Sequence, residues 1–132
     1  MRLLPELTPE TTAFWTGGER GELLITHCDA CDHAIHPPEL ICPKCLSRSV
    51  TPKPASGKGT ILTVTVNHQP WMPGLEVPYA LAIVALDDQP HVRITSRIVG
   101  IAPDEVAIGM PVEVTFEQVE DVWMPQFRPA GA

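Results

Sequence analysis

The sequence predicts a mainly β protein, in which a short amino-terminal helix and a cysteine-rich ribbon precede a carboxy-terminal group of strands. Two Cys-x-x-Cys pairs lie in the first half, and short runs of β-branched and apolar residues fill the second half. These runs follow one another closely, with almost no helix between them. This spacing indicates a small antiparallel barrel or sandwich.

The length and charge of the chain limit the functions it can have. With 132 residues we expect one hydrophobic core. Nine basic residues against 16 acidic ones give a formal charge of −7, which repels phosphate backbones and makes nucleic-acid binding unfavourable. The amino terminus lacks a basic region followed by an apolar stretch, and no apolar run approaches the roughly 20 residues of a membrane-spanning helix. We therefore expect a soluble, cytoplasmic protein with reduced thiols.

The first predicted element is a helix of about two turns. Thr8 can cap it, Pro9 suits its first position, and Gly17 can close it in a left-handed conformation. Because so short a helix is marginal in water, Phe14 and Trp15 must pack on something. Their cover is either this chain's own core or another subunit.

The strands are predicted from residue type. Residues 22–27 form a strand that leads into the cysteine segment, and the ribbon meets the second half near residues 52–57. A helical turn is expected from Pro103. The second half contains four strongly β-branched segments and a fifth, weaker one: 60–66, 79–86, 92–99, 112–119 and 122–127.

The cysteine pairs are the strongest chemical signal. Cys28 and Cys31 are followed, after ten residues, by Cys42 and Cys45. Two facing knuckles of this kind supply the closed, tetrahedral four-sulfur shell that zinc accepts, so we expect a structural zinc ion in a ribbon with too few apolar side chains to fold alone. Iron fits the same sulfur geometry, and two disulfides are the alternative for an exported chain.

Residues near the cysteines carry two further expectations. Asp32 and Leu46 follow the second cysteine of each pair, where glycine is common because the backbone can require positive φ, and Leu46 would be strained there. His27, His33 and His36 are close enough to compete as metal ligands. A four-cysteine shell needs none of them, so we expect hydrogen-bonding or exposed histidines.

A series of short motifs runs along almost the whole chain in a fixed order. They are Phe14-Trp15, Pro37-Pro38, Cys42-Pro43-Lys44-Cys45, Ser56-Gly57-Lys58-Gly59-Thr60, Val77-Pro78-Tyr79, Ile108-Gly109-Met110-Pro111-Val112 and Phe127-Arg128-Pro129. As a set the motifs are specific, although each alone is weak. With these motifs, the chain resembles the OB-fold, rubredoxin-like zinc-ribbon family of acyl-CoA-associated proteins, a domain of unknown function.

The resemblance implies three units: a helical segment over 1–21, a zinc ribbon over 22–54 and a five-stranded OB barrel over 55–132. Family members assemble with thiolase-like enzymes, among them acetyltransferases and aldolases that shorten steroid side chains. The thiolase-like subunit carries the catalytic residues. For this chain the resemblance implies a non-catalytic accessory or scaffold subunit of a hetero-oligomer, which stabilises the complex and helps to shape its CoA and acyl site.

Several side chains are candidates for contacts in such a complex. Trp71 and Met72 lie in a stiff loop, where they either contact a partner or acyl chain, or cap the open end of the barrel. Phe14 and Trp15 are further candidates for the partner interface. The candidate contacts to CoA phosphates are Lys58, Arg93 and Arg97, although isolated basic residues are usually only solubilising.

An independent enzyme is not indicated. The metal accounts for all four cysteines, and neither H-E-x-x-H nor G-x-S-x-G occurs. Asp87 and Asp88 indicate a solvated turn between strands rather than paired catalytic carboxylates. The remaining alternatives are a free-standing acyl-CoA-binding protein and a single-stranded nucleic-acid binder, because OB barrels often bind strands.

Overall fold

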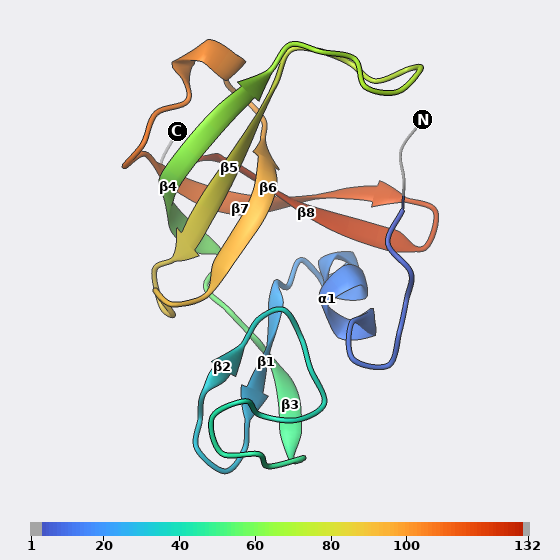
Figure 1. Ribbon diagram of the computed structural model, residues 1–132, viewed down its shortest axis with the longest axis vertical. Helices are drawn as coiled ribbons and strands as arrows, with labels where there is room; N and C mark the ends of the chain where they lie inside the picture. Colours follow the sequence, from blue (N-terminus) through green and yellow to red (C-terminus); the bar gives the residue numbers. More distant parts are fainter. Residues whose placement is uncertain (1–3, 131–132) are drawn as a thin grey trace.

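The strands form two sheets, a small one in the ribbon and a closed barrel beyond it (Figure 1). This computed structural model describes residues 4–130. No helix in that range is long and apolar enough to cross a membrane. The elements in chain order are α1 (Thr12–Thr16), the 3₁₀ helix η1 (Gly17–Arg20), β1 (Leu24–Cys28), β2 (Ala34–Ile35), β3 (Val50–Pro54), β4 (Lys58–Asn67), β5 (Tyr79–Leu86), β6 (Arg93–Ile98), the 3₁₀ helix η2 (Pro103–Glu105), β7 (Pro111–Val119) and β8 (Val122–Pro129).

The carboxy-terminal half is a five-stranded closed barrel in the order β4-β5-β6-β8-β7, with β7 returning to β4. Neighbouring strands are antiparallel except β6 and β8, which pair in parallel where Ile98 lies opposite Phe127. Phe127, Val84 and Val112 are fully buried inside the barrel. The mainly β prediction and the five strands are confirmed, and the barrel rather than the sandwich is formed.

The ribbon sheet has the order β2-β1-β3. The strand predicted over 22–27 corresponds to β1, two residues later at its start. β3 was not predicted from the sequence, because Pro52 and Pro54 cannot donate ladder hydrogen bonds. As an edge strand paired only with β1, β3 tolerates both prolines, which lie opposite Thr26 and Leu24.

The helix is shorter than expected and begins later. Thr8 does not cap it: the Thr8 carbonyl accepts the N–H groups of Thr11 and Thr12 in a preceding turn, and α1 begins at Thr12. Gly17 does not adopt a left-handed conformation, since its φ is −59°. The chain continues instead into η1, which ends at Arg20 and is followed by Gly21 with φ of 71°. The predicted helix and its end are therefore displaced along the sequence.

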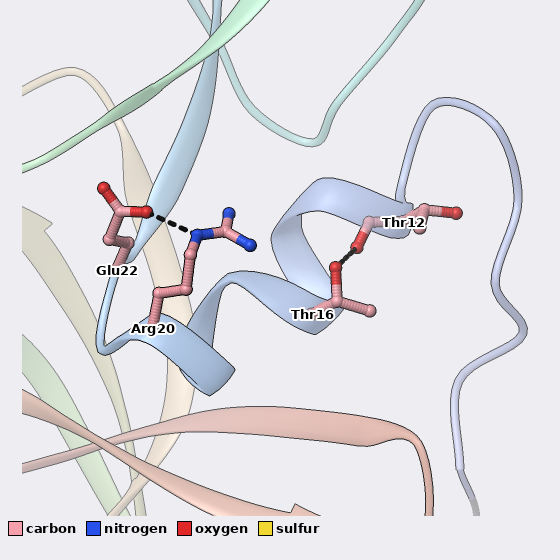
Figure 2. Close-up of polar contacts among 4 residues, drawn as sticks. All are labelled: Thr12, Thr16, Arg20 and Glu22. Carbon is pink, nitrogen blue, oxygen red and sulfur yellow. Dashed lines mark hydrogen bonds and ion pairs between the residues drawn. The ribbon is translucent and has the colours of Figure 1, made fainter.

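Side-chain contacts support the two short helices. Within α1, the Thr16 hydroxyl donates to the Thr12 carbonyl at 2.7 Å, and Arg20, the last residue of η1, contacts the Glu22 carboxylate through its guanidinium at 2.9 Å (Figure 2). Phe14 is buried in the core that the barrel shares with β1. The helix thus packs on this chain's own core, which is one of the two packing partners expected for it.

Two glycines allow this helical segment to lie close to the barrel and β1. A Cβ atom on Gly18 would lie 2.6 Å from the Phe116 ring and 2.7 Å from Trp123 Cβ, and one on Gly17 would lie 2.5 Å from the Glu22 carbonyl oxygen. Gly17 is therefore required for close approach and not for positive φ. The segment that carries Trp15 is held against the β7 and β8 strands by this contact.

Replacing Gly18 by alanine should destabilise the fold by about 1–3 kcal/mol, because the added Cβ would lie 2.6 Å from the Phe116 ring and 2.7 Å from Trp123 Cβ, so these groups would have to shift. Chemical unfolding measures the change. Glu19→Ala, at the exposed neighbouring position, is the control and should change the free energy of unfolding by less than about 0.5 kcal/mol. Equal stability of Gly18→Ala and the wild-type chain would contradict the close packing.

Candidate functional site

The four cysteines predicted as a metal site come together in the ribbon, where Cys28 is the last residue of β1. Figure 1 shows β1 running away from the barrel. Their sulfur atoms all lie within 4.8 Å of one another, with Cys28 and Cys45 sulfurs 3.5 Å apart and Cys31 and Cys42 sulfurs 3.7 Å apart. A tetrahedron with metal–sulfur bonds of about 2.3 Å has sulfur–sulfur edges of about 3.8 Å. The observed spacing fits a four-sulfur zinc shell and is too long for disulfides.

The two knuckles have the same backbone geometry. In the first, the Asp32 N–H donates to the Cys28 carbonyl at 2.9 Å, and in the second the Leu46 N–H donates to the Cys42 carbonyl at 2.8 Å. Asp32 and Leu46 have φ of 61° and 66°, so both positions adopt the left-handed conformation anticipated from the sequence. Leu46 has no glycine-like freedom and accepts the strain that this conformation imposes on a side chain.

Backbone N–H groups favour thiolates in the cluster. The Cys31 N–H, 3.4 Å from the Cys28 sulfur, is the main cause that lowers the pKa of Cys28 to about 7. For Cys31, the His33 N–H favours the thiolate, but burial and the neighbouring sulfurs outweigh it and raise the pKa of Cys31 to about 12. Crowded sulfurs thus resist losing all their protons together. A cation among them removes that resistance, which fits a metal-binding donor set.

The end of the ribbon has little core of its own. The buried cluster there consists of Cys28, Cys42 and Ile35, with Val50 packed against it. Two aliphatic side chains bury too little apolar surface to hold the knuckles in place. The sulfur cluster must therefore supply most of the cohesion at this end.

The histidines near the cysteines are engaged elsewhere. His27 Nδ1 lies 2.9 Å from the Ile25 carbonyl, and His36 packs on the Phe14 ring with centroids 5.0 Å apart. His33 stacks on His91 at 5.1 Å, across the junction between ribbon and barrel. The cluster of candidate metal ligands found within residues 4–130 contains the cysteines and none of these histidines.

A second candidate site is a hollow of about 280 Å³ on the outside of the barrel. It brings together three residues singled out in the sequence, Trp15, Met72 and Arg97. The Arg97 guanidinium lies over the Tyr79 ring, 4.6 Å from its centroid. The hollow therefore combines apolar walls with one basic group held in a fixed position.

The other candidate contact residues lie outside this hollow. Phe14 is 6% exposed within the core, which removes it as a docking side chain. Trp71 is 73% exposed, so it does not cap the barrel, and its indole N–H donates to the Asn67 side chain at 3.1 Å. Lys58 and Arg93 are exposed on β4 and β6 and do not line the hollow.

Sequence reasoning missed two residues near these candidates. Leu81 and Thr95 line the hollow with Trp15 and also a second, adjoining depression of about 230 Å³. The available signal was β5 itself, because residues 79–86 are apolar without interruption. An exposed barrel strand normally alternates apolar and polar residues, so this run indicates cover on both faces.

Comparison with known families matches both halves of the chain. The family model described as the ChsH2 rubredoxin-like zinc ribbon domain matches residues 15–51. The model described as the ChsH2 C-terminal OB-fold domain matches residues 52–117. The ribbon and the barrel observed in the structure correspond to these two descriptions, in the same order along the chain.

Two curated relatives are much longer than this chain. It is 34% identical over 131 residues to a probable enoyl-CoA hydratase alpha subunit of Thermomonospora curvata, covering 98% of this chain and 40% of that protein. It is also 34% identical over 125 residues to the 3-oxo-4,17-pregnadiene-20-carboxyl-CoA hydratase alpha subunit of Mycobacterium tuberculosis, covering 92% of this chain and 39% of that protein. The chain thus spans about two fifths of the length of both relatives.

Other relatives match over most of their length. A DUF35 domain-containing scaffold protein of Methanocaldococcus jannaschii is 35% identical over 105 residues, or 78% of this chain and 73% of that protein. A chain of the solved structure described as Ltp2-ChsH2(DUF35) aldolase superposes with a TM-score of 0.85 at 36% identity, covering 96% of this chain and 99% of that one. With both domain models and a full-length structural match in agreement, this chain belongs to the DUF35 family of ChsH2-type zinc-ribbon and OB-fold proteins.

Proposed function

We propose that this chain is a non-catalytic, cytoplasmic accessory subunit of a thiolase-like acyl-CoA enzyme, of the acetyltransferase or steroid side-chain aldolase type. It stabilises the complex and helps to shape the CoA and acyl site. Its three units are the helical segment 1–21, the zinc ribbon 22–54 and the OB barrel 55–132. Free acyl-CoA binding by the chain alone is the second candidate, favoured by the apolar hollow beside Arg97.

The observation that carries this proposal is the full-length match to the DUF35 chain of an aldolase whose description joins it to a second component. Relatives described as hydratase alpha subunits and as a scaffold protein agree with a role inside an assembly. A steroid acyl-CoA appears in the name of the mycobacterial relative, which supports the aldolase type. We therefore propose a steroid acyl group as the substrate of the partner.

The chemistry of the metal site supports a structural role. Cys28, Cys31, Cys42 and Cys45 would fill all four positions around one zinc ion and leave none for water or substrate. Bound there, zinc would fix the two knuckles relative to each other. Iron in the same shell is the less favoured occupant.

The proposed contacts to the partner and its ligand are on the barrel and the loop above it. Trp71, Met72 and Trp15 form the proposed protein interface, with Met72 and Trp15 lining the hollow. Arg97 in the same hollow is proposed to contact an anionic group, either a phosphate of CoA or a carboxylate of the partner. Lys58 and Arg93, exposed on β4 and β6, are the other two proposed contacts to the phosphates of CoA.

Replacing Cys42 by serine should remove the bound zinc and loosen the end of the ribbon, because Ile35 and Val50 alone bury too little surface to hold it. Elemental analysis should find about one zinc per wild-type chain and almost none in Cys42→Ser. Amide exchange should rise in residues 28–50 while β4 to β8 stay protected. Lys44→Ser, a change at an exposed position between Cys42 and Cys45, is the control and should retain zinc. Unchanged metal content and protection in Cys42→Ser would contradict the site.

Co-expression tests the accessory role. The chain should purify with the thiolase-like subunit of its own cell, and omitting the chain should reduce that subunit's solubility or activity. The reason is that exposed apolar surface on both proteins would lose its cover. Separate elution of the two proteins, with the thiolase-like subunit fully active alone, would count against the proposed function.

Trp71→Ala tests the loop as part of the interface. The indole is 73% exposed, so its removal should change the free energy of unfolding by less than about 0.5 kcal/mol. Binding to the thiolase-like subunit should weaken at least about tenfold, as is typical of an interface tryptophan. Calorimetry and thermal unfolding measure the two effects. A collapse in stability with unchanged binding would remove Trp71 from the interface.

A further inference from the structure

The outer face of β4, β5 and β6 departs from the pattern of a water-exposed barrel. Along β5, Ala80, Ala82, Val84 and Leu86 are buried inside, while the alternate residues point outward and are also apolar. The outward neighbours on β4 and β6 are mostly threonine and arginine. We define the β5 face as Tyr79, Leu81 and Ile83 with the flanking residues Thr63, Thr65, Arg93, Thr95 and Arg97.

The strand register places these residues in rows across the face. Ile83 lies between Thr63 and Thr95, and Leu81 lies between Thr65 and Arg97. The two hollows of about 280 and 230 Å³ adjoin on this face, since Leu81 and Thr95 line both. The result is an apolar stripe with a polar border, the arrangement found at protein–protein contacts.

The charge of the β5 face is opposite to that of the chain. The chain has a formal charge of −7, yet the face carries Arg93 and Arg97 and no carboxylate among its defined residues. The ion pairs found within residues 4–130 are Arg20 with Glu22 and Arg128 with Glu113, so neither arginine of the face has an acidic partner there. An acidic group of another molecule could form an ion pair with each of these two arginines.

This charge distribution argues against a second copy of the chain as the occupant. A two-fold contact would bring the same face from both copies, and the defined residues of that face include no carboxylate to pair with Arg97. Burying that guanidinium without an acid is costly. If the face instead paired with an acidic surface elsewhere on a second copy, the contact would be head-to-tail. Such a contact does not form a closed two-fold dimer.

We propose that the β5 face docks a protein of different sequence, through an apolar patch bordered by carboxylates that pair with Arg97 and Arg93. The proposal rests on the proposed function, and the thiolase-like subunit is that protein. Three strands over eight residues cover about 14 Å by 26 Å, roughly half of the ~800 Å² that a stable contact takes from each partner. The adjoining residues Trp15, Met72 and Trp71 supply further area.

The test measures binding of the intact chain to the thiolase-like subunit by calorimetry. Leu81→Thr combined with Ile83→Thr places β-branched threonine, a good strand former, at both positions but removes the apolar stripe, and should weaken binding at least about tenfold. Ile108→Thr, an exposed apolar residue that lines neither hollow, is the matched control and should bind as the wild-type chain does. Thermal unfolding verifies that each variant is folded.

Arg97→Glu provides a second readout that a purely structural role would not change. Wild-type binding should weaken as salt rises, whereas Arg97→Glu should bind more weakly at low salt and lose much of that salt dependence. If the wild-type chain binds and both face variants bind with the same affinity, the docking face is wrong and the proposed function still holds. No binding by the wild-type chain would overturn both.

Two further measurements distinguish other occupants. Sedimentation of the chain alone should show a monomer, and a dimer that Leu81→Thr/Ile83→Thr dissociates would assign the face to a second copy instead. A fluorescent oligo-dT strand should not bind, since Tyr79 is the one aromatic side chain in the defined face and Arg97 already covers it. Strand binding that Arg97→Glu abolishes would assign the face to nucleic acid.

Discussion

The arrangement of the ribbon depends on four sulfur atoms that converge within 4.8 Å. Because only Ile35 and Val50 accompany the cysteines in the cluster at that end, apolar burial cannot replace the cysteines there. Closer to the barrel the situation differs: Leu23 and Ile25 belong to the same core as Val84 and Phe127. The ribbon is thus joined to the barrel by ordinary packing and closed at its far end by the sulfur cluster.

Because the sulfur cluster lies in the ribbon, the outer surface of the barrel remains available for contacts with other molecules. The ribbon lies at one end of the long axis and the loop between β4 and β5 at the other, with α1 beside the β7 and β8 strands (Figure 1). Trp15, carried by α1, and Met72, carried by the loop, reach the same hollow as Arg97. Segments far apart in the sequence therefore contribute to one side of the molecule. A zinc ion with four cysteine ligands in the ribbon would have no open position for chemistry there.

Much of this could be predicted from the sequence, because the signals were local. Cys-x-x-Cys spacing predicted the sulfur cluster, β-branched runs predicted the five barrel strands, and the left-handed positions of Asp32 and Leu46 follow from knuckle geometry. What failed depended on tertiary contacts. β3 was not predicted because it contains two prolines, which an edge strand tolerates. Gly17 allows close packing and does not cap a helix. The β5 face was missed because the apolar run over 79–86 was used only to predict a strand and was not compared with the apolar–polar alternation of an exposed barrel strand.

The account depends most directly on a closed four-sulfur zinc shell, which separates a structural ribbon from a catalytic metal site. X-ray absorption spectroscopy at the zinc edge, on protein purified under reducing conditions, measures that shell. The account predicts four sulfur neighbours at about 2.3 Å and no lighter ligand. A nitrogen or oxygen atom in the shell, or folded protein with no bound metal, would contradict it.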